Sequence, residues 1–188
     1  MARNDSSIQQ PARRLGTPRN VQPERLTRPA NIYFVWSTVL LAWLLSLLPW
    51  RAWEGAPDIL VLVVAFWCVN EPRRMGLVAA FCFGVLMDVH DVTVLGAHAL
   101  SYTLVAYGAV ALHRRLRHFD LLSQAIHMLP VFFVAQLAQQ LVLAWLAGRW
   151  SGWGWILSVL LMTVIWPLLG WVLHLPQGGA DDVESSSV

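Results

Sequence analysis

The sequence predicts an all-α polytopic membrane protein with six transmembrane helices and with both termini in the cytoplasm. Composition is the first observation, because 57% of the 188 residues are hydrophobic and only 13% are charged, with a mean hydropathy of +0.54. A soluble domain carries roughly 25% charged residues, so this balance is typical of an integral membrane protein. The other two observations are six separate apolar segments and a strongly uneven distribution of arginine.

The chain divides into one membrane domain with a polar segment on each side. Residues 1–30 contain six arginines and four prolines but few apolar residues, which predicts a flexible basic cytoplasmic tail. Residues 31–175 hold all the apolar segments and form the predicted six-helix membrane domain. Residues 176–188 are polar and acidic, and we expect a disordered cytoplasmic tail there.

The six apolar segments are each expected to form one spanning helix. They cover residues 32–48, 58–70, 75–88, 94–112, 121–147 and 154–173. The second and third segments would be only ~21 Å long as helices, shorter than the ~30 Å hydrocarbon core. A re-entrant hairpin is the alternative, but its tip would place Arg73 and Arg74 near mid-bilayer at roughly 2.5–3.5 kcal/mol each. We therefore expect six spans.

The arginines indicate the orientation. With the N-terminus inside, the cytoplasmic segments carry eleven of the thirteen arginines, and only Arg51 and Arg149 lie outside. Such an excess of basic residues is typical of cytoplasmic segments. Tryptophan is enriched at membrane interfaces, and six tryptophans fall at the predicted outer boundary. These are Trp50, Trp53, Trp145, Trp150, Trp153 and Trp155.

Small and amide residues suggest where helices pack. Gly76, Ala80 and Gly84 recur every four residues, a spacing that lets helix backbones approach closely in lipid. Gln136 and Gln140 stack on one face of the fifth helix, where amides can bond within the bundle or to a partner helix. The two cysteines, Cys68 and Cys82, are expected to be buried free thiols rather than a disulfide.

The acidic residues at the outer helix ends each allow two interpretations, a cap or a ligand-binding role. Asp58 is expected to cap the start of the second helix, in preference to binding a ligand. Asp88, His90 and Asp91 could bind a divalent metal, but a loop cap at the membrane edge, with Asp88 in water, is favoured. No nucleophile–base pair or phosphate-binding loop is present, so the sequence predicts a protein that is not an enzyme, with no metal, cofactor or nucleic acid.

One stretch carries a family resemblance. Pro57-Asp58 precedes a short helix, and Arg73 and Arg74 form the next turn. The sequences GLVAAFCFGVLMD and GAHALSYTLVAY follow, with Gly96 and Tyr102 in the second of them. This pattern resembles the rod shape-determining MreD family in its proteobacterial form. The resemblance covers residues 30–174. The candidate residues for helix packing or partner contact then also include Arg73, Arg74, Asp88, Gly96 and Tyr102.

The resemblance implies a multi-pass protein of the bacterial inner membrane that acts in cell elongation, rod shape and peptidoglycan synthesis. It implies partners similar to the single-span MreC, the filament-forming MreB, the glycosyltransferase RodA and a class B penicillin-binding protein. It also implies a fold similar to the substrate-binding subunits of energy-coupling-factor transporters.

Two functions compete at this point. The favoured one is a non-enzymatic scaffold that binds a partner helix in the membrane and cytoplasmic partners at Arg73-Arg74 and at residues 114–117. The alternative is a small-molecule binding subunit of an energy-coupling-factor-type vitamin transporter. That alternative requires polar and aromatic side chains around an outer cavity and a coupling face of small residues, for which Ala42 and Ser46 are the candidates.

Overall fold

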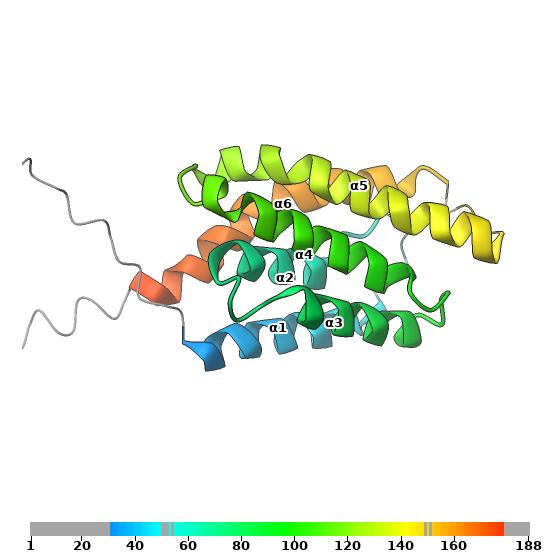
Figure 1. The fold of residues 1–188 in the computed structure, drawn as a ribbon, viewed down its shortest axis with the longest axis horizontal. Helices are drawn as coiled ribbons and strands as arrows, with labels where there is room; N and C mark the ends of the chain where they lie inside the picture. The colour runs from blue at the N-terminus through cyan, green and yellow to red at the C-terminus, as the bar shows by residue number, and fades with distance from the viewer. Residues whose placement is uncertain (1–30, 50–52, 54, 149, 151, 179–188) are drawn as a thin grey trace, which may run out of the picture.

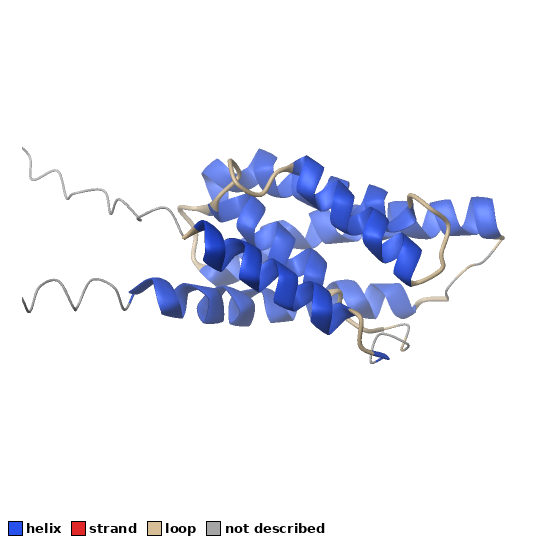
Figure 2. Ribbon diagram, turned by 90° about the horizontal axis from the view of Figure 1, so that it is seen from below, coloured by secondary structure: helices blue, strands red, loops and turns tan. Residues whose placement is uncertain are grey.

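The computed structural model describes residues 31–49, 53, 55–148, 150 and 152–178, with side chains described as far as residue 174. All regular elements among these residues are helices (Figure 2). They are α1 (Ile32–Ser46), α2 (Ile59–Asn70), α3 (Leu77–His90), α4 (Ala97–Leu116), α5 (Leu121–Ala147) and α6 (Gly154–Gly178). The all-helical prediction is confirmed, and the helix bounds lie close to those of the six apolar segments.

Successive helices run in opposite directions along the long axis of the molecule (Figure 1). The start of α1 and the end of α6 therefore lie at the same end. α4 packs against α3 and α5, and α5 packs against α6. α2 closes the arrangement by contacting α1, α4 and α6, so it lies in the middle of the bundle.

The central helix α2 is enclosed by protein on all sides. Every residue from Leu60 to Val69 is buried, whereas the longer α5 leaves much of its surface exposed. A helix of 12 residues is only ~18 Å long, and this burial explains how a segment too short for the lipid core is accommodated. It also explains why α2 is apolar all round, since a helix buried on every face has no polar side.

Side-chain hydrogen bonds tie α2 and the loop before it to the neighbouring helices. Trp67 Nε1 donates to the Thr38 hydroxyl of α1 at 2.9 Å. The Ser158 hydroxyl of α6 donates to the Ala56 carbonyl at 2.9 Å. Lipid tails are as apolar as leucine, so close packing and such interhelical bonds hold membrane helices together.

Two helices, α5 over residues 121–147 and α6 over residues 154–174, are long and apolar enough to cross a membrane, while α1, α2 and α3 are shorter apolar helices. The number of spans and their orientation therefore stay predictions. The predicted basic tail, residues 1–30, lies outside the described residues. α6 continues to Gly178, so residues 176–178 are helical rather than the start of the predicted acidic tail.

Two expectations about single side chains need correction. Trp155 was expected at the outer interface, but it is buried, with its ring 5.4 Å from that of Phe133. Trp53, Trp145, Trp150 and Trp153 are exposed as expected, and Trp50 lies outside the described residues. Both cysteines are free and Cys68 is buried, but Cys82 is exposed.

Candidate functional site

The Asp88 carboxylate of α3 caps the N-terminus of α4. Its Oδ2 atom accepts from the backbone N–H groups of Gly96 at 2.8 Å and Ala99 at 3.3 Å, and its Oδ1 atom accepts from that of His98 at 2.7 Å. The first N–H groups of a helix have no partner within the helix and carry its partial positive charge. A buried carboxylate at this position accepts hydrogen bonds from these N–H groups and also compensates the partial positive charge of the helix end.

Gly96 explains why this cap comes from another helix. Its φ is +103°, a backbone conformation that favours glycine, and it occupies the N-cap position without a side chain that could bond to the helix. An added Cβ would meet no atom within 4 Å. Gly96, a candidate for packing or partner contact, is thus a turn residue that leaves the cap to Asp88.

Asp88 is also bonded to side chains that lead to the surface. His98 Nδ1 lies 3.0 Å from Asp88 Oδ1, and the Thr93 hydroxyl donates to the same oxygen at 3.3 Å. The other ring nitrogen of His98 lies 3.5 Å from Asp91 Oδ2. His90 Nδ1, in turn, lies 2.8 Å from Asp91 Oδ1.

This geometry corrects the prediction that Asp88 lies in water, because the residue is only 1% exposed. His90 is exposed, as that interpretation expected. Within the part of the chain that the structure describes, no group of three His, Cys, Asp or Glu side chains is placed to hold a metal ion. The acidic loop is therefore a set of side-chain contacts around the start of α4.

The second buried carboxylate, Asp58, lies at the start of α2. It is the N-cap of that helix, where its Oδ1 atom accepts from the Val61 backbone N–H at 3.2 Å, as the cap prediction requires. Its Oδ2 atom accepts from the Tyr102 hydroxyl of α4 at 2.7 Å. Asp58 and Tyr102 are 5% and 1% exposed, so this bond lies inside the bundle.

His98 and Tyr102 lie one turn apart on α4, with ring centroids 6.3 Å apart. Each contacts a carboxylate from a different helix, so four residues connect α3, α4 and α2. We refer to Asp58, Asp88, His98 and Tyr102 as the α4 polar network. Ionisable groups in a membrane bundle are costly unless they pair inside it, and here they fix the relative positions of three helices.

Gly84 lies at the closest approach of α3 to α4. A Cβ added to it would be 2.4 Å from Ala99 Cα and 2.8 Å from Ala99 N, distances that would force the helices apart. Ala80, one turn earlier, is buried. Gly76 does not share this contact, because it precedes α3 and its added Cβ would have only the Pro72 carbonyl at 4.0 Å. Gly76 therefore lies outside the close contact made by Gly84, and a contact with a partner stays a prediction for it.

The two glutamines of α5 have different surroundings. Gln140 is 6% exposed, and its Oε1 atom has no hydrogen-bond partner among the described residues. Gln136 is half-buried. A partner helix could therefore reach Gln136 but not Gln140, which faces the interior.

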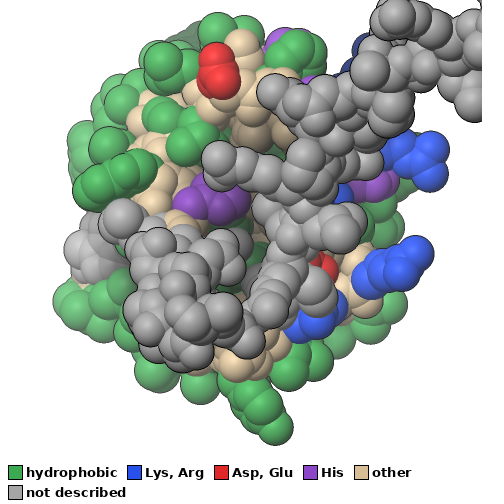
Figure 3. Space-filling view, turned by 90° about the vertical axis from the view of Figure 1, so that its left-hand side faces the viewer, with side chains coloured by type: hydrophobic (Ala, Val, Ile, Leu, Met, Phe, Trp, Pro, Cys, Tyr) green, Lys and Arg blue, Asp and Glu red, His purple; other side chains and the backbone are tan. Residues whose placement is uncertain are grey.

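The end of the molecule at which α1 begins and α6 ends carries the described arginines (Figure 3). Arg73 is exposed in the turn between α2 and α3, while Arg74 is half-buried beside Glu71, with Nε 3.8 Å from Oε2. Three more exposed arginines end α4 or follow it, namely Arg114, Arg115 and Arg117. Apolar side chains surround them on this face.

His98 was not among the candidate residues, although the sequence contained a signal for it. It lies within the predicted span 94–112, and an ionisable residue inside a membrane segment is by default a functional candidate. Thr38 and Ser158 were missed as well, and for them no comparable signal exists, because hydroxyls are common in membrane helices.

Residues 28–175 match the family model described as rod shape-determining protein MreD. The chain belongs to the MreD family. The rod shape-determining protein MreD of Haemophilus influenzae is 28% identical over 146 residues, which are 74% of this chain and 88% of that protein. No solved structure matches the fold. Membership assigns this MreD family protein to rod-shape determination at the membrane.

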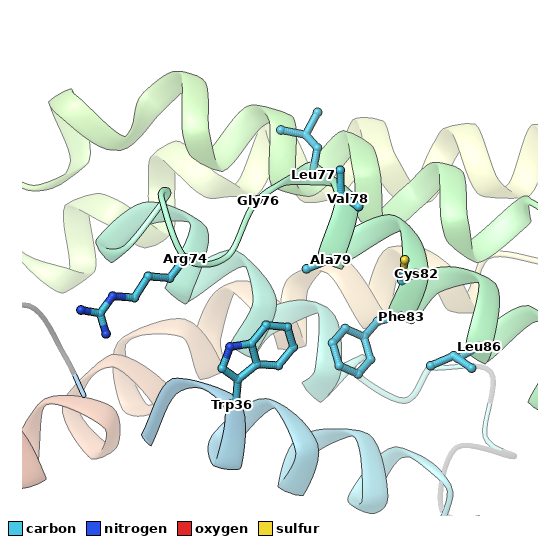
Figure 4. Close-up of a pocket in the computed structure, with 9 residues that line it drawn as sticks. All are labelled: Trp36, Arg74, Gly76, Leu77, Val78, Ala79, Cys82, Phe83 and Leu86. Carbon is cyan, nitrogen blue, oxygen red and sulfur yellow. The ribbon is translucent and has the colours of Figure 1, made fainter. Parts of the chain in front are cut away.

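The transporter alternative gains no support from these findings. Ala42 and Ser46, the candidates for a coupling face, are buried at 3% and 1% exposure and do not form an outer surface. The cavity of Figure 4 lies between α1 and α3, and its lining is apolar apart from Arg74 and the Gly76 backbone. It is not an outer cavity lined by converging polar side chains.

Proposed function

We propose that this MreD family protein is a non-enzymatic, multi-pass scaffold of the inner membrane that holds the cell-elongation machinery together. The α4 polar network is the observation that carries the proposal. Its two carboxylates accept hydrogen bonds from helix ends and neighbouring side chains, so its ionisable groups serve to position helices. A rigid bundle of this kind acts through the partners that it binds.

The proposed topology has six spans with both termini inside. The shared end of α1 and α6 supports it, as does the gathering of described arginines at that end (Figures 1 and 3). Reporter fusions at residues 53, 90 and 150 should read as periplasmic, and fusions at 73, 116 and 180 as cytoplasmic. A cytoplasmic signal at residue 90 would rule out six spans.

The partner in the membrane is proposed to be a single-span protein similar to MreC. On α5, the half-buried Gln136 lies one turn after the exposed Phe133, and a helix packed there can bond to the amide. The filament, glycosyltransferase and transpeptidase partners implied by the resemblance would then be assembled around this pair. Arg73 and the exposed arginines at the end of α4, namely Arg114, Arg115 and Arg117, are the proposed cytoplasmic contacts.

Single substitutions on α5 test the partner face. Gln136→Leu should reduce co-purification of the single-span partner from mild detergent, because it removes an amide from the exposed face. Gln140→Leu is the matched control, since the same change at a buried site should leave co-purification at the wild-type level. Equal retention of the partner by both variants would show that Gln136 of α5 does not contribute to the interface.

Changing Arg73 to Ala tests the cytoplasmic side. If the residue contacts a partner, cell width should increase while the fusions above keep their signals. Inverted fusion signals would instead indicate that Arg73 acts on topology. Normal width with normal orientation would exclude both roles.

A further inference from the structure

An apolar groove runs between α1 and α3, open to the surface of the bundle (Figure 4). Its volume is about 530 Å³. α1 packs against α2, and α3 packs against α4, while the rings of Trp36 and Phe83 approach each other across the groove with centroids 6.5 Å apart. Trp36, Val78, Cys82, Phe83 and Leu86 supply most of its wall.

Among the described residues that line the groove, one is charged, and it lies at one end. Arg74 comes from the turn before α3 and lies beyond Trp36, toward the end of the molecule at which α1 begins (Figure 4). Its side chain is 28% exposed. A guanidinium has five N–H donors and binds phosphate oxygens in a two-pronged geometry, so Arg74, whose Nε lies 3.8 Å from Glu71 Oε2, places a phosphate-binding group at this end of the groove.

This shape fits a molecule with a long apolar part and an anionic group at one end. A partner helix is ~10 Å across with its side chains, too wide to enter a groove across which the Trp36 and Phe83 ring centroids lie 6.5 Å apart. An acyl chain is narrower and needs no hydrogen bonds from the wall. The neighbouring exposed Arg73 adds a second positive charge for the head group.

We propose that the α1–α3 groove binds one anionic phospholipid, with its phosphate held by Arg74 and an acyl chain lying between Trp36 and Leu86. On the orientation proposed above, the lipid belongs to the cytoplasmic leaflet, whose anionic lipids attract basic residues at the membrane surface. The lipid site itself does not depend on that orientation. The lipid would fill the space between α1 and α3, beside the point where Trp36 and Phe83 approach each other.

Native mass spectrometry of the purified full chain in mild detergent tests the proposal, with phosphatidylglycerol and phosphatidylcholine of identical acyl chains as probes. The wild type should retain one phosphatidylglycerol and little phosphatidylcholine. Arg74→Gln should lower the affinity for phosphatidylglycerol roughly fivefold, the effect of one basic residue at an anionic surface. Arg115→Gln, an exposed arginine near the end of α4, is the matched control and should bind as the wild type does.

Cys82 provides a second measurement that needs no destabilising change. It lines the groove and is exposed, whereas Cys68, the other cysteine of the chain, is buried. Added phosphatidylglycerol should slow the reaction of Cys82 with a maleimide in the wild type but not in Arg74→Gln. Cys82→Trp should fill the groove and abolish lipid retention although Arg74 is intact.

Equal retention of the two lipids, or an equal loss in Arg115→Gln, would overturn the proposal in favour of unselective lipid contact. Protection of Cys82 by a co-purified polypeptide, with no phosphatidylglycerol bound, would overturn it in favour of a partner helix. The assay uses purified protein and does not measure cell shape. A negative result would therefore count against lipid binding and not against the proposed scaffold function.

Discussion

The Tyr102 hydroxyl donates a 2.7 Å hydrogen bond to Asp58 Oδ2, joining the second turn of α4 to the residue that caps α2. Both groups are buried, so the bond replaces contacts that each would otherwise make with water. One turn earlier on α4, His98 contacts Asp88 of α3. The start of α4 is therefore the place where three helices are held in register.

Replacing Tyr102 with Phe removes this bond and keeps the ring. Hydrogen bonds to charged groups contribute about 1.5–3 kcal/mol, so the variant should unfold at a visibly lower temperature in detergent. Tyr107→Phe is the matched control, because Tyr107 lies on the same helix and is 63% exposed. Equal melting temperatures for the two variants would mean that the Asp58 contact contributes nothing measurable.

Replacing Asp88 with Asn keeps the size of the side chain but removes its charge. The amide NH₂ would face backbone N–H groups, which cannot accept a hydrogen bond from it. The one remaining oxygen would have to accept from all the backbone N–H groups that now bond to two carboxylate oxygens. We expect a loss of about 1–3 kcal/mol in the free energy of unfolding, measured by denaturant or thermal unfolding in detergent. Asp120→Asn should be neutral, since Asp120 occupies the N-cap position of α5 without a capping hydrogen bond. A loss of the same size at both positions would contradict a specific role for Asp88.

Replacing Gly84 with Ala tests the contact between α3 and α4. The added methyl would lie 2.4 Å from Ala99 Cα, and relieving that clash should cost about 1–3 kcal/mol, with a larger cost for Gly84→Leu. Gly76→Ala adds the same methyl where the nearest atom is 4.0 Å away, so it should lower the melting temperature less than Gly84→Ala does. A wild-type melting profile for Gly84→Ala would show that the helices can separate freely at this point.

The sequence was sufficient to predict the helices, because each one is an apolar run bounded by charged or turn residues. The cap role of Asp58 could also be predicted from the local sequence, because Asp58 directly precedes an apolar segment. The close approach at Gly84 followed from a small residue in the middle of such a run.

Contacts between distant residues could not be predicted in this way. Asp58 and Tyr102 are 44 positions apart, and nothing in either segment indicates that the two side chains meet. Asp88 was expected in water because its loop is acidic, whereas Gly96 at a positive φ turns α4 so that its first N–H groups point at the carboxylate. The interior position of α2 also depends on the packing of the other helices, since a buried helix and a lipid-facing one are equally apolar.

Cell width after depletion of the protein in its native host tests the central claim most directly. If this MreD family member holds the elongation machinery together, rods should widen into spheres as the protein is lost, and re-expression of the wild type should restore them. Rods of unchanged width in a clean deletion would contradict the account.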